Sequence, residues 1–533
     1  MNLNKKAIFL FGGLLIIIWS NFTLAGNLSS ITVNPRDPAA GEESFYDFVF
    51  TTSDTGNGTD AGIPEDGKIL LTFPVGFDIS PAEIATLSFS GGTAGGFNSI
   101  GKSGNTITLE RDSTGSAISG NTQVTITVAN IENNQTASNY TVSIETQKND
   151  GTTIDTGTSS PFSISHAELD HLSFGTVSNQ IAGTPFTLTI SALDAYNNIV
   201  TSFTSSGTLS DRTGTISPTS TNNFIAGEWT GNVTISSTYN NNTITVTAGG
   251  DAGTSNSFDV LPGSIDRFQF SSISSPKTAG TAFNITITAY DANNNIVTNF
   301  TDPVSLSDNT GTIQPTATGS FSSGQWSGNV TITKKQTDVR ITATNNGSSG
   351  QSNNFNVRAA ALDHYLISNI SNQTAGIPFT ITVRAQDIYN NTVDDFSGTV
   401  DISDLTGGVT PTTSGNFSGG LWSGDVTINE AFTNNIITVT RSSGGAQSGS
   451  SNGFNVSAGT LDHFDFAAIS TQTAGAGFGI TITAKDASNN TITSFTETAN
   501  LSDETGTISP SVTGAFVNGV WSGTVTITET RSG

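Results

Sequence analysis

The stretch Thr184-Pro-Phe-Thr-Leu-Thr-Ile-Ser-Ala-Leu-Asp-Ala-Tyr-Asn-Asn-Ile-Val200 decides the fold. Between Phe186 and Ala192 apolar and polar residues alternate, which is typical of a β-strand with one buried and one wet face. The strand runs into the turn Asp194-Ala-Tyr-Asn-Asn198. Because two antiparallel sheets packed face to face would bury the apolar sides of such strands, the pattern favours a β-sandwich.

This strand and turn recur along the chain. The turn is repeated as Asp291-Ala-Asn-Asn-Asn295, Asp387-Ile-Tyr-Asn-Asn391 and Asp486-Ala-Ser-Asn-Asn490, at spacings of 97, 96 and 99 residues. Four tryptophans follow the same three spacings: Trp229, Trp326, Trp422 and Trp521. A period of this length matches one complete sandwich of about 100 residues.

The turn resembles the strand-turn-strand of bacterial immunoglobulin-like repeats, as in the invasin and intimin group of surface adhesins. That group typically has Asp-Ala-x-Gly-Asn, and here Asn stands where Gly would sit. Asn tolerates the left-handed backbone conformation, so the turn geometry is expected to survive. The resemblance covers about 365 residues. It implies an all-β fold of tandem immunoglobulin-like β-sandwiches. Linkers of about four residues, such as 261–264, predict an elongated rod.

The landmarks divide the chain into six parts. The expected boundaries are 1–25 for a signal peptide, 26–165 for an N-terminal β-sandwich module without the repeat landmarks, and 166–263, 264–360, 361–459 and 460–533 for immunoglobulin-like repeats 1 to 4. Repeat 4 lacks the segments that match 244–246 and 258–260, so we expect the sequence to be a fragment.

The first 25 residues have the pattern of an export signal. Lys5 and Lys6 precede an apolar run from Ala7 to Trp19, and Thr23-Leu-Ala25 predicts cleavage before Gly26. The run is shorter than the ~18 residues that span a bilayer, so no transmembrane segment is expected after cleavage. An uncleaved anchor is the alternative.

Composition excludes several function classes. The chain has 18 Lys and Arg against 43 Asp and Glu, a net charge of −25, which would repel nucleic acid. It has no cysteine, which excludes disulfides, thiolate metal sites and a cysteine nucleophile. An exported sandwich without a disulfide favours a bacterial source.

The histidines do not indicate an enzyme. His171, His364 and His463 occupy one repeat position, where repeat 2 has Arg267, and His166 lies nearby at the same domain start. A catalytic histidine is not expected to come in copies at domain starts. We therefore expect no catalytic residues.

The repeated aspartates allow two interpretations. Each turn aspartate stands at a strand end, where its carboxylate can accept backbone N–H groups of the turn. Alternatively, the aspartate at the start of each repeat and the turn aspartate share one pole of the sandwich and bind calcium between modules. The residues concerned are Asp170, Asp194, Asp266, Asp291, Asp363, Asp387, Asp462 and Asp486. No other cofactor is expected.

The tryptophans also allow two interpretations. In Trp326-Ser-Gly-Asn-Val-Thr-Ile332 the tryptophan shares its face with Val330 and Ile332, which predicts a core position. An exposed platform on which a sugar stacks is the alternative.

These observations predict an exported, non-catalytic bacterial cell-surface stalk or adhesin. Its partner would be an extracellular or surface ligand, protein or glycan, that the sequence does not identify. Two alternatives remain: an accessory array of a secreted carbohydrate-active or other hydrolytic enzyme, and a matrix or surface-layer structural protein.

Overall fold

The computed structural model describes residues 25–54 and 61–532, and the regular secondary structure there consists of β-strands. The expected signal peptide, Ala25 apart, lies outside the described residues. The described part of the chain contains no helix that could span a lipid bilayer. Two compact units are present, the first ending at Gly263 and the second beginning at Ser264.

The first unit begins with a large sandwich, the N-terminal module. Its sheets have the strand orders β1-β11-β10-β4-β7-β6 and β2-β3-β8-β5, with a small third sheet of β9 and β12. Its strands are β1 (Gly26–Asn27), β2 (Ser29–Pro35), β3 (Glu43–Thr51), β4 (Lys68–Thr72), β5 (Glu83–Phe89), β6 (Phe97–Ser103), β7 (Thr106–Arg111), β8 (Gln123–Glu132), β9 (Ser138–Tyr140), β10 (Ser143–Gln147), β11 (Thr153–Thr158) and β12 (Phe162–Ile164).

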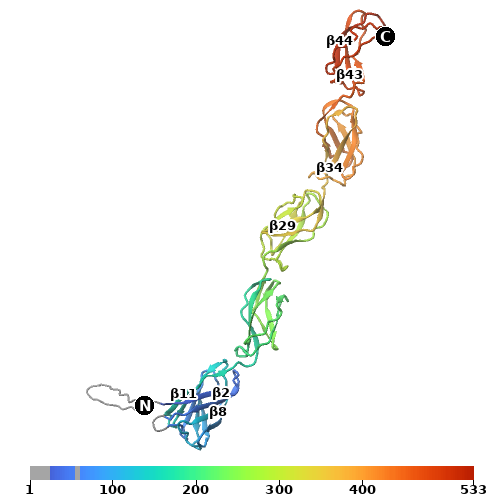
Figure 1. Ribbon diagram of the computed structural model, residues 1–533. Helices are drawn as coiled ribbons and strands as arrows, with labels where there is room; N and C mark the ends of the chain where they lie inside the picture. Colours follow the sequence, from blue (N-terminus) through green and yellow to red (C-terminus); the bar gives the residue numbers. More distant parts are fainter. Residues whose placement is uncertain (1–24, 55–60, 533) are drawn as a thin grey trace, which may run out of the picture. The chain divides into compact units, whose positions relative to one another are not determined.

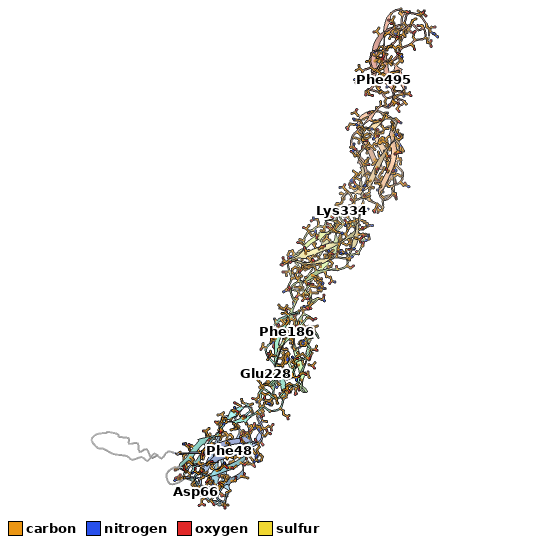
Figure 2. The ribbon with its side chains drawn as sticks, in the orientation of Figure 1. Phe48, Asp66, Phe186, Glu228, Lys334 and Phe495 are labelled. Carbon is orange, nitrogen blue, oxygen red and sulfur yellow. The ribbon has the colours of Figure 1, made fainter. Side chains whose placement is uncertain are left out.

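The core of this module follows the alternation of its sequence. Tyr46, Phe48 and Phe50 of β3 are buried, and Phe48 is labelled in Figure 2. The segment 140–146, whose alternation is that of a single strand, belongs to two strands: β9 pairs with β12, whereas β10 pairs with β4 and β11. The chain changes sheets between them.

Repeat 1, whose ribbon is teal to green in Figure 1, completes the first unit. It has its own core. One sheet has the order β13-β15-β18-β17, and the other strands form β16-β20-β21 and β14-β22-β19. The strands are β13 (His171–Phe174), β14 (Gln180–Ile181), β15 (Phe186–Leu193), β16 (Thr208–Asp211), β17 (Ile216–Ser217), β18 (Glu228–Ile235), β19 (Tyr239–Asn242), β20 (Ile244–Ala248), β21 (Asp251–Thr254) and β22 (Phe258–Leu261).

This order defines the fold of the repeat. The strands can be named by the immunoglobulin convention. One sheet then contains strands A (β13), B (β15), E (β18) and D (β17), and the other contains strands C (β16), F (β20) and G (β21). That is the arrangement of a constant-type immunoglobulin sandwich. The fold expected from the sequence is therefore confirmed.

Repeats 2 and 3, in the second unit, have the same plan, except that strand D of repeat 2 is reduced to a bridge between Gln314 and Thr331. In repeat 2 a parallel bridge between Arg267 and Ser349 also joins strand A to strand G. The strands of repeat 2 are β23 (Arg267–Phe270), β24 (Lys277–Thr278), β25 (Phe283–Tyr290), β26 (Ser305–Asp308), β27 (Gln325–Val330), β28 (Gln336–Val339), β29 (Ile341–Asn345), β30 (Ser348–Gln351) and β31 (Phe355–Arg358). Those of repeat 3 are β32 (Leu362–Ile367), β33 (Gln373–Thr374), β34 (Phe379–Asp387), β35 (Val400–Asp404), β36 (Val409–Thr410), β37 (Leu421–Ile428), β38 (Phe432–Asn435), β39 (Ile437–Arg441), β40 (Ser448–Ser450) and β41 (Phe454–Ser457).

Repeat 4 contributes a sheet of β42 (His463–Phe466), β43 (Gly477–Lys485) and β44 (Val520–Thr526), which correspond to strands A, B and E. It has a core of its own around Ile482 and Phe516.

The tryptophan side chains face the cores of their repeats, as the alternation along their strands predicts, but they lie at the edge of each core. Trp229 is buried, whereas Trp326, Trp422 and Trp521 are partly buried and pack against the cores of their repeats. The six-membered ring of Trp326 lies over Gly328, two residues along the same strand, where a Cβ would overlap the ring. The core interpretation holds with this refinement.

Candidate functional site: the junctions between modules

The turn aspartate of each repeat is almost fully buried. In repeat 3, Oδ1 of Asp387 accepts the backbone N–H groups of Tyr389 (2.9 Å) and Asn391 (2.8 Å). The fourth residue of every turn has a positive φ, as the sequence predicted: Asn197 (67°), Asn294 (66°), Asn390 (65°) and Asn489 (65°). The carboxylate therefore caps the turn.

The second carboxylate oxygen holds the linker from the preceding module. Oδ2 of Asp387 accepts the backbone N–H of Ala360 at 2.8 Å. The same bond joins Ala167 to Asp194 (2.9 Å) and Gly459 to Asp486 (2.8 Å). Each of these three aspartates thus connects its own turn to the linker.

The last asparagine of the turn contacts the preceding module. Oδ1 of Asn391 accepts the backbone N–H of Lys335 (2.8 Å), and its Nδ2 donates to the carbonyl of Thr333 (2.7 Å). A side-chain amide that offers one acceptor and one donor in this way pairs with the backbone as a strand would.

Two more junctions repeat this amide pairing. Asn198 binds the N–H of Ala137 (2.9 Å) and the carbonyl of Gln135 (2.8 Å), within the first unit. Asn490 binds Ala431 (2.8 Å) and Asn429 (2.6 Å), within the second. We call this shared set of bonds the amide clamp.

A glycine in the preceding module receives the middle of the turn. Gly280 of repeat 2 has φ +72°, and a Cβ there would overlap the phenol of Tyr389. Gly41 of the N-terminal module has the same relation to Tyr196 of repeat 1. A side chain at either glycine would have to displace the end of that tyrosine, and the positive φ of the glycine would strain it.

The junction of repeats 2 and 3 adds an ion pair. Nζ of Lys335 lies 2.7 Å from Oδ2 of Asp394 and donates to the carbonyl of Thr392 at 3.1 Å. The hydrogen bond with Lys335 lowers the pKa of Asp394.

The same hydrogen bonds lower the pKa values of two turn aspartates. Burial alone would raise the pKa of Asp194, but the bonds from Asn198 and from the N–H of Ala167 outweigh it and lower the pKa. Burial would also raise the pKa of Asp486, but the bonds from Asn490 and from the N–H of Gly459 outweigh it and lower the pKa.

The other aspartates proposed as calcium ligands lie beside the turns but pair differently. The backbone N–H of Asp170 donates to the carbonyl of Leu193, the residue before Asp194. The two aspartates therefore lie at the same pole of the sandwich, as the calcium interpretation requires. The half-exposed side chain of Asp170 pairs with His171 at 2.9 Å. The pairs Asp363 with His364 (3.0 Å) and Asp462 with His463 (2.9 Å) repeat this contact.

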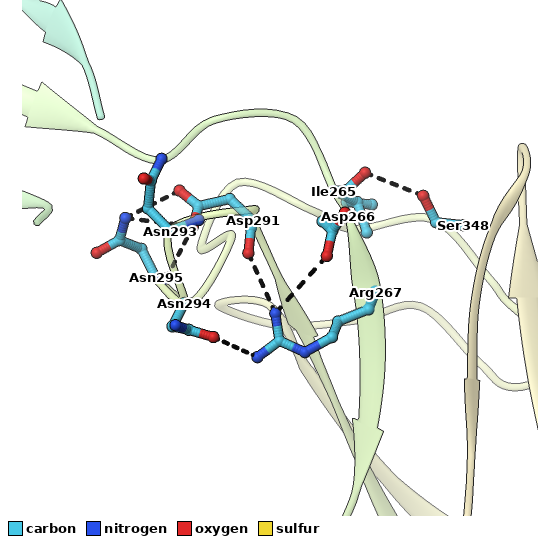
Figure 3. A network of polar contacts seen from close by, with 8 residues as sticks. All are labelled: Ile265, Asp266, Arg267, Asp291, Asn293, Asn294, Asn295 and Ser348. Atoms are coloured by element: carbon cyan, nitrogen blue, oxygen red, sulfur yellow. Dashed lines mark hydrogen bonds and ion pairs between the residues drawn. The ribbon is translucent and has the colours of Figure 1, made fainter. Parts of the chain in front are cut away.

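Repeat 2 has a guanidinium in place of the histidine (Figure 3). Nη1 of Arg267 donates to the carbonyl of Asp291 (3.3 Å) and lies 3.7 Å from Oδ2 of Asp266. Its Nη2 donates to Oδ1 of Asn294 at 2.7 Å. A cation of the protein thus lies beside the carboxylate of Asp266 and the backbone carbonyl of Asp291.

Within residues 25–54 and 61–532, no group of three or more His, Cys, Asp or Glu side chains could hold a metal ion. Calcium at the junctions stays a prediction.

A second set of aspartates caps another turn, between strands C and D. Oδ1 of Asp211 accepts the N–H of Thr215 and Ile216 (both 3.0 Å), and Oδ2 accepts the amide of the buried Asn242 (3.0 Å). Burial would raise the pKa of Asp211, but bonds from Thr213 and Asn242 lower it. Asp404 of repeat 3 behaves in the same way.

Sequence reasoning missed the amide clamp and the glycine that receives the turn. The last asparagine recurs at 198, 295, 391 and 490 with the repeat spacings, so the signal was present. A single sequence does not show which loop of the preceding module faces that asparagine.

The comparisons with known proteins found likenesses of low similarity. No family model and no curated protein matches the sequence. Similar solved structures include the Escherichia coli adhesin FdeC, with 18% identity over 55% of this chain and 99% of that chain and a TM-score of 0.29. Invasin, described as a bacterial integrin-binding protein, has 14% identity, covers 81% of this chain and 79% of its own, and gives 0.26. InvD of Yersinia pseudotuberculosis has 14% identity over 61% and 96%, with 0.28.

All three likenesses have identities below 25% and TM-scores below 0.5. The strand order of the repeats, and not these likenesses, establishes the fold.

Proposed function

We propose that the protein is an exported bacterial cell-surface stalk of the adhesin kind, without catalytic activity. The observation that carries the proposal is the recurrence of the amide clamp at three junctions. A stalk must hold its modules against one another, and side-chain bonds to the preceding backbone do this. A flexible tether would need none of them.

The linker bonds support the same function. Each buried aspartate at these junctions fixes the first residues of its module as well as its own turn. Rotation about the linker would leave a buried carboxylate without some of its donors, which is costly. The junctions are therefore built to resist bending.

Export and surface display can be tested on intact cells. The coding sequence with residues 1–25 and a matched version without them would be expressed in a bacterium, and the cells would be treated with an external protease. We expect loss of the protein from the cell surface only when residues 1–25 are present. Protection in both cases would contradict the proposal, and release into the medium would favour the accessory array of a secreted enzyme.

A further inference from the structure

Asp155 of β11 is a fully buried carboxylate of the N-terminal module. Its donors are the backbone N–H of Ser53 (3.3 Å) and the Ser53 hydroxyl. Among the described residues it has no ion pair with a lysine, arginine or histidine. A buried carboxylate without a cation is costly, so this position calls for a positive charge.

Gly26 is the residue placed to supply it. It is buried, and β1 pairs in parallel with β11 so that Gly26 lies opposite Asp155. A Cβ on Gly26 would overlap both Oδ1 of Asp155 and the hydroxyl of Ser53. The Gly26 nitrogen, one bond from that Cα, therefore lies within about 5 Å of the carboxylate.

We propose that cleavage before Gly26 creates an α-ammonium that pairs with Asp155 and completes the N-terminal module. The inference rests on the proposed export. One water hydrolyses the Ala25–Gly26 peptide bond, leaving a carboxylate on Ala25 and a protonated amine on Gly26, so no further reactant is needed. The ordinary pKa of an α-amino group is about 7.7–8.0, and a nearby carboxylate raises it.

The ammonium can bind without disturbing the sheet. It carries three N–H donors, so one can continue the pairing of β1 with β11 while another reaches Oδ1 of Asp155. In the precursor the same nitrogen is an uncharged amide. The N-terminal module therefore gains its full stability only after the leader is removed, which keeps the precursor easier to unfold during export.

The test compares two forms of the chain that both end at residue 533, each made from a fusion whose protease leaves no extra residue. One form begins at Gly26, and the other retains Ala25, which moves the ammonium one residue away. We expect retention of Ala25 to lower the melting temperature of the N-terminal module by about 5 °C. The Asp155→Asn variant should show no difference between the two forms.

A matched variant separates pairing from general disturbance. Ser53→Ala removes the hydroxyl next to Asp155 but keeps the carboxylate, so the effect of Ala25 should persist. Equal melting of the two forms, or an equal loss in Asp155→Asn, would overturn the inference. If Asp155→Asn does not fold, ¹⁵N NMR of Gly26 decides: an α-ammonium titrating at its ordinary pKa would overturn the pairing.

Mass spectrometry of the exported protein tests the cleavage site separately. A mature chain that begins elsewhere would overturn the maturation step, whereas the engineered pair would still report on the contact with Asp155.

Discussion

A single buried carboxylate can hold a turn, a linker and an asparagine when each of its oxygens accepts hydrogen bonds. Asp387 does this with donors from two places in the chain: its own turn, which includes the amide of Asn391, and the backbone N–H of Ala360. Donors that compensate burial favour the charged form. In the turn between strands C and D, hydrogen bonds outweigh burial and lower the pKa of Asp211 and Asp404, which has a measurable consequence.

Acid should weaken the repeats through the C–D turns. The pKa values of Asp211 and Asp404 are lowered in the folded protein, so the stability they contribute is present above the unfolded value of about 3.9 and is lost as pH falls below it. Denaturation midpoints measured from pH 6 to pH 2 should fall less steeply in the Asp404→Asn variant, which has no charge to lose there. An identical slope in both proteins would contradict this role.

Replacement of Trp326 by alanine should destabilise repeat 2 by about 3 kcal/mol, because the ring packs against the core and no side chain at Gly328 can fill its place. The Asn329→Ala variant, at an exposed position on the outward face of the same strand, is the control and should change little. Hydrogen exchange resolved by repeat would report the loss, with repeat 4 unaffected. An exposed sugar platform would instead leave the stability of repeat 2 unchanged.

At the scale of elements, the strands were predictable and their contacts with the next module were not. Alternation located the strand from Phe186 and its end before Asp194, because burial of one face determines that pattern. The break between β9 and β10 could not be predicted, since a change of sheet leaves no mark on the apolar spacing. Turn capping by Asp194 needs only local backbone and was anticipated, whereas the contact of Gly280 with Tyr389 depends on how two modules meet.

The amide clamp predicts a specific effect on hydrogen exchange. Asn391→Ala removes the acceptor of the Lys335 N–H, so that proton should exchange faster by tenfold or more, corresponding to about 1.4 kcal/mol of lost protection. The core strands of repeats 2 and 3 should keep their protection. Asn416, exposed in repeat 3, provides the matched Asn→Ala control. Unchanged exchange at Lys335 would mean that the clamp does not hold in solution.

At the scale of the whole molecule, the elongated rod expected from the short linkers stays a prediction. Five modules of roughly 40 Å each would reach about 200 Å. Small-angle scattering of residues 26–533 should give a maximum dimension of this order. A compact particle would contradict the stalk and would require contacts between modules that are distant in the sequence.

Calcium binding by the repeated aspartates at the module junctions stays a proposal. The junctions differ in the charges that would surround a bound calcium ion. In repeat 2 the guanidinium of Arg267 lies beside Asp266 and opposes a second cation, whereas repeat 3 has His364 at that position. Asp363 and Asp387 are therefore the pair to test. A bound ion should stabilise the protein by about 2.7 kcal/mol at a hundredfold excess over Kd.

Calorimetric titration and melting of residues 26–533, with magnesium at equal ionic strength as the control, would measure this calcium effect. The double variant Asp363→Asn, Asp387→Asn should lose the calcium-specific heat, and Asp266→Asn should keep it, because Arg267 already occupies that pole. If calcium and magnesium act alike on the unaltered protein, the ions only screen its acidic surface. The turn aspartates then act through hydrogen bonds alone, and the strength of each junction is set by the donors around its carboxylate.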